Sequence, residues 1–327
     1  MILIISSVDD ISTNYVIDWL IHYNIKFLRI TDNDLISISK IEISNNDIPN
    51  ITFSTKGKSY NLNAFKNIWY RRGWVVPDKK IISEVTLNIK VLREPLLKQL
   101  NTEIDDLMNF FVSNIEKKSL NKMSDNKLSK LLCLSKAKEQ GIKVPETIIT
   151  SNKEDVIRFR KKYKEIITKN STQGVFVYDK DQLLNVYTQL LSDKDIKDLP
   201  DYFFPTLFQE AIEKKVELRI FFIENEFYGS AIFSQQDEMT KVDFRNYNFN
   251  KPNRTPPFEL NNSDKEKFRI LMKNLNLNSG SIDCIINKRN ELVFLEVNPI
   301  GQYAQVSNPC NYFLDKKIAE YLMTKIN

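Results

Sequence analysis

Two short apolar runs near the C-terminus constrain the fold more than any other feature of this chain. They span residues 282–286 and 292–297, and the polar residues Asn287–Asn290 separate them. Runs rich in β-branched residues on either side of a four-residue polar connection are typical of two antiparallel strands joined by a turn. We therefore predict a β-hairpin near the end of the chain.

Polar side chains interrupt this apolar hairpin at Asp283, Glu296 and Asn298. If the strands pair symmetrically about the turn, Asp283 lies opposite Phe294. Side chains alternate along a strand, so Phe294, Glu296 and Asn298 are expected on one face, which Asp283 joins from the partner strand. Asp283 and Glu296 are then diagonal neighbours, about 7 Å apart at the backbone.

Two carboxylates on the inner face of an apolar hairpin repel each other and lose hydration, so such a pair persists mainly where a cation lies between them. Hard oxygen ligands without a nearby Cys or His suit magnesium, which takes one or two carboxylates and adds substrate phosphates. The pattern therefore predicts a magnesium site. The alternative, in which Glu296 and Asn298 lie on a solvated face and Asp283 caps a turn, stays open.

The length of 327 residues, with 42% hydrophobic and 27% charged residues, allows a substantial core and two or three structural units. No run approaches the roughly 18 apolar residues needed to span a bilayer. The apolar start Met1–Ile5 continues into Ser-Ser-Val-Asp-Asp without the layout of a signal peptide. We expect a protein of the cytoplasm that does not act at a membrane.

Several classes of function are disfavoured by the composition. Cys133, Cys284 and Cys310 show no metal-ligand spacing, so we expect reduced core thiols. The single histidine, His22, lies in an apolar helical pattern, which argues against catalytic triads and histidine metal sites. A net charge of +5 without a basic stripe argues against nucleic-acid binding, and the sequence has neither a P-loop nor a Rossmann glycine motif.

The first 115 residues predict a small α/β unit. A strand at 1–6, a helix at 12–23 and a strand at 26–30 form its opening, and a further strand is expected at 68–72. The polar run 113–124 marks the end of this unit.

The next segment predicts a helix that stops at Gly141. Lys169 then ends a short strand, and the polar residues 170–174 precede a second strand at 175–178. A lysine at such a strand end can point at phosphates while the backbone N–H groups of the loop fold over them. A helix is expected over residues 179–191.

A third unit is expected to begin at Tyr202. The strands, the polar loop and the two helices predicted in it are, in order, 207–212, 216–222, 227–233, the loop 234–248, the capped helix 263–275 and the last helix 311–326.

A family resemblance is carried by the C-terminal motifs. Asp283, followed by the hairpin and by Phe-Leu-Glu-Val-Asn-Pro at 294–299, resembles the metal-binding end of ATP-grasp ligases. Gly301-Gln302 and Asn308-Pro309-Cys310-Asn311 narrow the resemblance to the ATP-grasp peptide maturases of the graspetide (microviridin-type) group, particularly those of grasp-with-spasm systems. The resemblance implies an α/β (α+β) ATP-grasp fold. Its parts are an N-terminal pre-ATP-grasp α/β domain (1–115), a central subdomain (116–201) and a C-terminal antiparallel-sheet subdomain with the metal site (202–327).

The resemblance also implies which residues bind ATP and magnesium. Asp283, Glu296 and Asn298 would hold magnesium on the ATP phosphates. Lys130 falls where the family places a phosphate-binding lysine, with Lys127 as the competing assignment. The other nucleotide-binding residues implied are the phosphate lysine Lys169, Gln173 and Gly174 of a mobile loop, the adenine hinge Gln209, Glu210, Ala211 and Ile212, and the ribose-binding Glu217.

Three further residues are implied in substrate activation. The run Val-Asp-Phe-Arg at 242–245 resembles part of the grasp-with-spasm maturases, and ribosomal-protein glutamate ligases share its Asp-Phe-Arg core. Arg245 is the candidate to hold the carboxylate being activated, because a guanidinium pairs with a carboxylate through two hydrogen bonds. Asp243 would orient Arg245, and Arg219 would point toward the phosphates. Tyr70-Arg71-Arg72 resembles an element in the N-terminal unit of the maturases, with Arg72 as a candidate and a surface strand end as the alternative.

The implied function is ATP-dependent maturation of a precursor peptide with a leader and a core. An Asp or Glu side chain of the peptide attacks the γ-phosphate, which gives an acyl phosphate and ADP. A Thr, Ser or Lys side chain then displaces phosphate and closes an ester or amide ring, while the loop 171–174 excludes water. No general base is evident in the sequence.

Two other functions stay open beside this one. The first is a ligase, like the ribosomal-protein glutamate ligases, that adds amino acids to a protein or peptide. The second is a peptide-binding scaffold without catalysis. A homodimer and a partner modifying enzyme are also left open.

Overall fold

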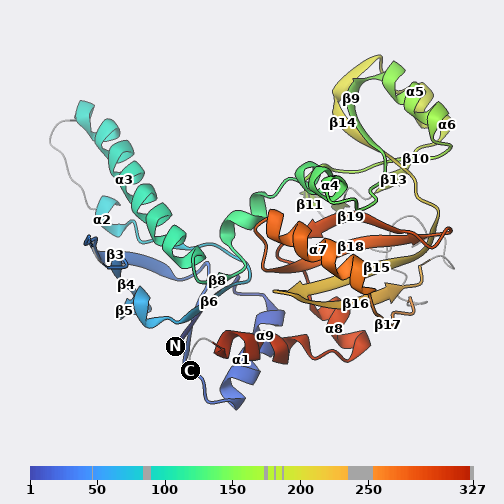
Figure 1. Cartoon of the computed structure of the whole chain (residues 1–327). Helices are drawn as coiled ribbons and strands as arrows, with labels where there is room; N and C mark the ends of the chain where they lie inside the picture. Colours follow the sequence, from blue (N-terminus) through green and yellow to red (C-terminus); the bar gives the residue numbers. More distant parts are fainter. Residues whose placement is uncertain are drawn as a thin grey trace. The chain divides into compact units, whose positions relative to one another are not determined.

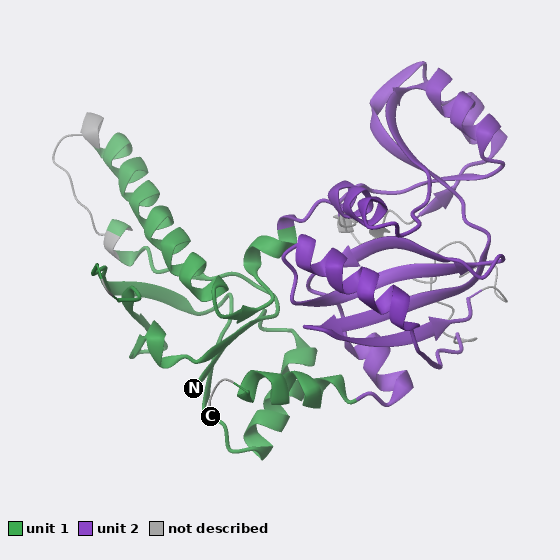
Figure 2. Ribbon diagram, viewed as in Figure 1, with its two compact units in different colours: residues 1–126, 313–327 green, residues 127–312 purple. Residues whose placement is uncertain are grey.

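The computed structural model describes residues 1–45, 47–83, 90–172, 176–179, 182–185, 188–234 and 253–324. The chain forms two compact units, the first from residues 1–126 and 313–327 and the second from residues 127–312 (Figure 2). Most of the expected central and C-terminal segments lie together in the second unit. The finer division into three parts, at residues 115 and 201, stays a prediction. No helix in the described ranges is both long and apolar enough to cross a lipid bilayer.

The first unit is built on a parallel sheet of strand order β2-β1-β6-β8. Its strands are β1 (Ile2–Ile5), β2 (Phe27–Ile30), β6 (Asn67–Tyr70) and β8 (Ser119–Leu120). All four residues of β1 are fully buried, as expected for a parallel strand covered on both faces. The predicted helix between β1 and β2 is α1 (Ile11–His22), so the β-α-β opening is confirmed.

The last helix of the chain, α9 (Leu314–Met323), belongs to this first unit and packs beside α1 (Figure 1). Trp19 Nε1 donates a hydrogen bond to Asp315 Oδ2 at 2.6 Å, and Asn67 Nδ2 on β6 donates to Leu322 O at 2.8 Å. These contacts join the end of the chain to its beginning.

A second, mixed sheet of order β5-β4-β3-β7 completes the first unit. Its strands are β3 (Leu35–Glu42), β4 (Asn50–Thr55), β5 (Lys58–Asn61) and β7 (Val76–Pro77). The helices of this part are α2 (Lys80–Ser83) and α3 (Lys90–Glu116), and a 3-10 turn covers Leu62–Ala64. Phe111 of α3 packs edge-on against Phe53 of β4, with ring centroids 5.0 Å apart.

The second unit is centred on an antiparallel sheet of order β17-β16-β15-β18-β19. The strands are β15 (Lys214–Ile223), β16 (Glu226–Ile232), β17 (Pro257–Phe258), β18 (Ser279–Asn287) and β19 (Leu292–Asn298). Helices α4 (Lys130–Glu139) and α7 (Asn262–Asn274) pack with one face of this sheet around a core that includes Phe222, Phe268 and Phe294. Helix α8 (Ala304–Cys310) contacts β15 and β16.

A smaller sheet of order β13-β10-β14-β9 forms the rest of the second unit (Figure 1). Its strands and the helices that pack with it are β9 (Thr147–Asn152), β10 (Ile166–Thr168), β13 (Gln189–Leu190), β14 (Tyr202–Glu210), α5 (Lys153–Lys162) and α6 (Asp193–Asp198). The helix expected over residues 179–191 is wrong. Residues Gln182–Asn185 form β12, which pairs with β11 (Phe176–Asp179), and β13 pairs with β10, so strand pairing overrides the local helical pattern.

Candidate active site

The predicted C-terminal hairpin is present as β18 and β19, but its register differs from the expected one. Ile286 pairs with Leu292, one residue beyond the expected Glu291, and a β-bulge between Asp283 and Cys284 shifts the register by one more residue. Cys284 therefore pairs with Phe294, and Asp283 pairs directly with Glu296. The expected pairing of Asp283 with Phe294 is therefore wrong. The two carboxyl groups are direct cross-strand partners instead of diagonal neighbours.

The bulge also changes which residues share a face. A bulge adds one residue to one strand, so every side chain beyond it turns to the opposite face of the sheet. Phe294 is fully buried in the core with α4 and α7, whereas Glu296 and Asn298 lie on the other face. The expectation that Phe294 shares a face with Glu296 is therefore wrong. Because of the bulge, one short strand contributes Phe294 to the apolar core and Glu296 to the acidic site on the other face.

Asp283 is held by a cation from the neighbouring strand. Arg219 of β15 pairs in register with Asp283, and its Nη1 lies 2.7 Å from Oδ1 and 2.8 Å from Oδ2 of the carboxylate. Asn298 Nδ2 donates to Asp283 Oδ2 at 3.1 Å. Arg219 Nε is buried and has no hydrogen-bond partner among the described residues, so this donor is left for a group that the described residues do not supply.

Glu296 is held by a second cation. Lys130 is the first residue of α4, and its Nζ lies 2.9 Å from Glu296 Oε2. The side chains are 17% and 12% exposed, so little solvent screens the pair. Lys127, the competing assignment, is exposed and lies in the 3-10 turn before α4. Of the two lysines, Lys130 is the one that contacts the acid pair.

The donor set fits a divalent cation with hard-oxygen preference. The carboxylates of Asp283 and Glu296 belong to directly paired residues of neighbouring strands. The side-chain amide of Asn298 supplies a third oxygen, because a flip of this amide exchanges the positions of its oxygen and nitrogen. Two protein carboxylates and further oxygens from phosphate and water suit magnesium. A cation between Asp283 and Glu296 would compete with Arg219 and Lys130, which would then be available to other anions.

The nearby thiols are unsuited to metal binding. Burial raises the pKa of the Cys133 thiol to about 12, and the charge of Glu296 adds to the rise. Burial likewise raises the pKa of Cys284, with a further contribution from Asp283. Both groups stay protonated at neutral pH, so the oxygen ligands are the available donors.

Gly301 brings the chain past the acid pair at close range. Ser281 pairs with Asn298 at the open end of the hairpin, and a Cβ at Gly301 would collide with the hydroxyl and the backbone of Ser281. The Oγ of Ser281 is buried and has no hydrogen-bond partner in the described part of the chain. A glycine is therefore required here for the segment after β19 to pack on β18.

The expected adenine hinge joins β14 to β15. Gln209 is buried, and its Nε2 donates to Thr147 Oγ1 at 2.8 Å. The backbone N–H of Glu210 donates to Glu146 O at 2.9 Å, and that of Ala211 donates to Glu165 O at 3.0 Å. Ile212 follows in this linker, partly buried. Both N–H groups are bonded within the chain, so they fix the linker, and its role as an adenine hinge stays a prediction.

Glu217, expected to bind ribose, lies two residues before Arg219 and on the same face of β15. It is 8% exposed, and its Oε1 accepts from Lys214 Nζ and from Ser234 Oγ, each at 2.6 Å. The sequence did not single out Lys214 or Ser234. Residues three apart on a regular strand point to opposite faces, and the register shift between Lys214 and Val216 brings these two side chains together, so the sequence carried no signal for the pair.

The remaining candidates are Lys169 and four residues that lie outside the described part of the chain. Lys169 directly follows β10 and is partly buried, and Ser171 and Thr172 after it are exposed. The candidates whose positions lie outside the described residues are Gln173, Gly174, Asp243 and Arg245. The structure thus brings together Lys130, Arg219, Asp283, Glu296 and Asn298.

Comparison with known proteins shows which family the chain resembles. A family model described as a RimK-like ATP-grasp domain matches residues 124–322. A search of curated proteins gave no match.

Solved structures match over nearly the whole chain. The RiPP-associated ATP-grasp ligase of Chryseobacterium gregarium, in complex with ADP and a leader and core peptide, is 26% identical with a TM-score of 0.81, over 99% of this chain and 96% of that one. The macrocyclase MdnC of Microcystis aeruginosa, bound with precursor peptide MdnA, is 23% identical with a TM-score of 0.73, over 98% and 99%. The ATP-grasp ligase PsnB, with minimal precursor, Mg and ADP, is 16% identical with a TM-score of 0.73, over 100% and 97%. These likenesses extend the ATP-grasp fold to the whole chain, the first unit included.

Proposed function

Because the chain belongs to the RimK-like ATP-grasp family, we propose that it is an ADP-forming ligase that activates side-chain carboxylates of a ribosomal precursor peptide and closes rings within that peptide. The observation that carries this proposal is the acid pair Asp283 and Glu296, directly opposed on β18 and β19 and matched by Arg219 and Lys130.

ATP and magnesium fit this site. Asp283, Glu296 and Asn298 would hold magnesium, and the bound metal would neutralise the β- and γ-phosphates of ATP. Displaced from their carboxylate partners, Lys130 and Arg219 would bind phosphate oxygens, with Lys169 as a third cation. Phosphoryl transfer depends mainly on such positioning and charge neutralisation.

The reaction has two steps. An Asp or Glu side chain of the peptide attacks the γ-phosphate, and ADP leaves, which produces an acyl phosphate. The hydroxyl of a Thr or Ser, or the amine of a Lys, then attacks the acyl carbon, and phosphate leaves with formation of an ester or an amide. Arg245, oriented by Asp243, is our proposed ligand for the carboxylate, and Gln173 and Gly174 belong to the loop proposed to exclude water.

The similarity to the Chryseobacterium gregarium ligase supports a peptide substrate. The two chains are 26% identical over nearly their full lengths, and that ligase is in complex with a leader and a core peptide. We therefore propose that this chain also binds a precursor with a leader and a core.

Mass spectrometry tests the proposal. The protein is incubated with MgATP and a candidate precursor rich in Thr or Ser and Glu or Asp, and the peptide and released ADP are measured. Ring closure removes one water for each bond, and Asp283→Asn abolishes both the mass loss and ADP release. Absence of peptide-dependent ADP release with all such precursors would contradict the proposal.

A second candidate function is favoured by the run Asp-Phe-Arg at 243–245, which resembles ribosomal-protein glutamate ligases, enzymes that append amino acids. Such an enzyme would increase the mass of its acceptor by whole residues in the presence of a free amino acid. The same mass spectra therefore separate the two functions.

We further propose that the enzyme acts in the cytoplasm and forms a homodimer, with a partner modifying enzyme as an additional component. Sedimentation of the purified protein, with and without precursor, measures the first association. A monomer at all concentrations would contradict the dimer.

A further inference from the structure

A buried ion pair joins Lys214 to Glu217, which lies on the same face of β15 as Arg219. Lys214 Nζ is 2.6 Å from Glu217 Oε1, and the two side chains are 7% and 10% exposed. The hydroxyl of Ser234, a fully buried residue shortly after the end of β16, donates to the same oxygen at 2.6 Å. One oxygen of this carboxylate is therefore held by a cation and a hydroxyl from two separate segments of the chain.

A register shift at the start of β15 decides which lysine reaches Glu217. The ladder of β15 with β18 has one extra residue on β15 between Lys214 and Val216. Because of this extra residue, Lys214 turns to the face of Glu217, although it lies three residues before it. The next residue, Lys215, is exposed, and its Nζ donates to Asn290 Oδ1 in the hairpin turn at 2.8 Å. Two adjacent lysines thus have different surroundings.

The burial of this pair favours a functional use for its carboxylate. Both charges lose hydration when they are buried, and an apolar pair packed in the same place is often equally stable or more so. The pair is therefore weak evidence for stability. It lies on the face of the sheet that carries the acid pair Asp283 and Glu296, where an ionised carboxylate can bind a ligand.

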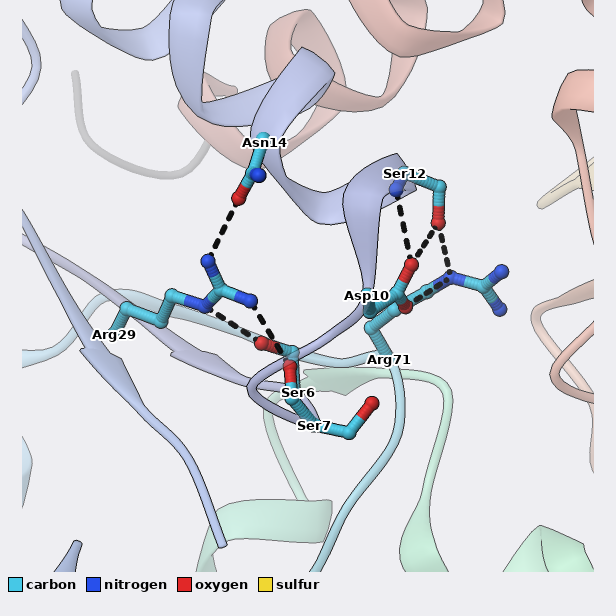
Figure 3. Close-up of polar contacts among 7 residues, drawn as sticks. All are labelled: Ser6, Ser7, Asp10, Ser12, Asn14, Arg29 and Arg71. Atoms are coloured by element: carbon cyan, nitrogen blue, oxygen red, sulfur yellow. Dashed lines mark hydrogen bonds and ion pairs between the residues drawn. The ribbon is translucent and has the colours of Figure 1, made fainter. Parts of the chain in front are cut away.

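A buried pair in the first unit is a contrasting, structural case (Figure 3). Arg71 Nε lies 3.2 Å from Asp10 Oδ2, and the side chains are 5% and 7% exposed. Asp10 is also the N-cap of α1 and accepts from Ser12 N at 3.0 Å, so the helix needs this carboxylate. Glu217 lies inside a strand, where no helix end needs a carboxylate.

The cation of Glu217 also differs from the cations of the acid pair. In the proposed function, magnesium replaces Arg219 and Lys130 at the acid pair. No metal is proposed at Glu217, and the hydroxyl groups of a ribose are neutral, so they cannot balance its charge. Lys214 would therefore stay on Glu217 when a nucleotide binds. A hydrogen bond from a ribose hydroxyl to an ionised carboxylate is about twice as strong as one between neutral groups.

We propose that Lys214 and Ser234 are positioning residues for nucleotide binding. They hold the Glu217 carboxylate in place and balance its charge, and they thereby set the preference of the enzyme for a nucleotide with ribose hydroxyl groups. This rests on the proposed function and on the expected binding of ribose by Glu217.

Binding of ADP and of 2′,3′-dideoxy-ADP to the full chain tests the proposal. Both nucleotides are titrated by calorimetry in saturating magnesium, and the ratio of their dissociation constants is the ribose preference. The wild type should prefer ADP about thirtyfold, because dideoxy-ADP lacks both hydroxyl groups. Lys214→Met should weaken ADP binding about tenfold and change dideoxy-ADP binding less than about twofold, so the preference falls to about threefold.

Two variants serve as controls. Lys215→Met removes the exposed neighbouring lysine, and Arg71→Met removes the cation of the similarly buried pair in Figure 3. Both should keep the wild-type ribose preference within about twofold, although Arg71→Met should lower the melting temperature.

The ratio separates a positioning role from a purely structural one. An equal loss of affinity for both nucleotides in Lys214→Met would mean that Lys214 only supports the fold, and this result overturns the proposal, as does an unchanged preference. If Lys214→Met does not fold, Ser234→Ala decides, because it removes the other donor and no charge. Its ribose preference should fall about threefold, and an unchanged value overturns the proposal.

Glu217→Gln distinguishes failure of this inference from failure of the proposed ligase. If Glu217→Gln loses the ribose preference and Lys214→Met keeps it, the positioning role is wrong and the ligase stands. If the wild type does not bind ADP in the presence of magnesium, both are wrong.

Discussion

Removing Arg219 is predicted to destabilise the second unit in a way that magnesium reverses. Arg219 and Asp283 have side chains 10% and 15% exposed, and one guanidinium nitrogen contacts both carboxylate oxygens at 2.7 and 2.8 Å. In Arg219→Met the carboxylate of Asp283 keeps its burial and loses its cation while it faces Glu296. Breaking one side of a buried pair costs about 3–5 kcal/mol, a large part of the roughly 5–15 kcal/mol of a folded domain.

Magnesium should restore part of this loss. A cation that binds only the folded state adds about 2.7 kcal/mol at 100 times its dissociation constant. Urea unfolding of Arg219→Met in EDTA and in saturating magnesium should therefore differ by about 2–3 kcal/mol. Arg269→Met is the control, because Arg269 is more exposed and bonds Glu266 on the surface of α7. The free energy of unfolding of Arg269→Met should fall by less than about 1 kcal/mol, and this decrease should not depend on magnesium.

Two results would refute this reasoning. One is a loss below about 1 kcal/mol for Arg219→Met in EDTA, which would mean that the acid pair does not need its cation. The other is equal stabilisation of both variants by magnesium, which would place the metal elsewhere.

Three further predictions follow from other contacts. Lys130→Ala should weaken MgATP binding about tenfold by calorimetry, whereas Lys138→Ala, exposed on the same helix, should not; equal effects would contradict the assignment of Lys130. Because burial raises the pKa of Cys133 to about 12, iodoacetamide at pH 8 should label it only after unfolding, and labelling of the native protein would contradict that burial. Burial also raises the pKa of Asp125 to about 6 from 3.8, so the folded state binds the proton more tightly and the free energy of unfolding should fall as pH rises from about 4 to about 6. Asp125→Asn should remove this dependence and stabilise the protein at pH 7 by about 1 kcal/mol, and a pH profile like that of the wild type would argue against it.

The hairpin, its acidic residues and the β-α-β opening could be predicted because they depend on local patterns. Alternating apolar residues on both sides of Asn287–Asn290 specify two strands, and hard oxygen donors specify the metal type. The ATP-grasp fold followed from the motif around Glu296 and is confirmed.

Other features could not be predicted because they depend on tertiary contacts. The bulge beside Asp283 changes the register by a single residue, and no alternation pattern distinguishes that register from the regular one. The strands that replace the helix expected at 179–191 form by pairing with β10 and β11. The ion pair of Lys214 with Glu217 needs both side chains to be buried on one strand, which composition does not reveal.

The bulge places Phe294 and Glu296 on opposite faces of β19, and Leu295 is the residue that it inserts. Deleting Leu295 would join Phe294 to Glu296 in a regular ladder, with Phe294 still opposite Cys284 and Glu296 still opposite Asp283. Homologous enzymes engineered by segment exchange should therefore accept this strand with or without the inserted residue, as long as Glu296 stays opposite Asp283.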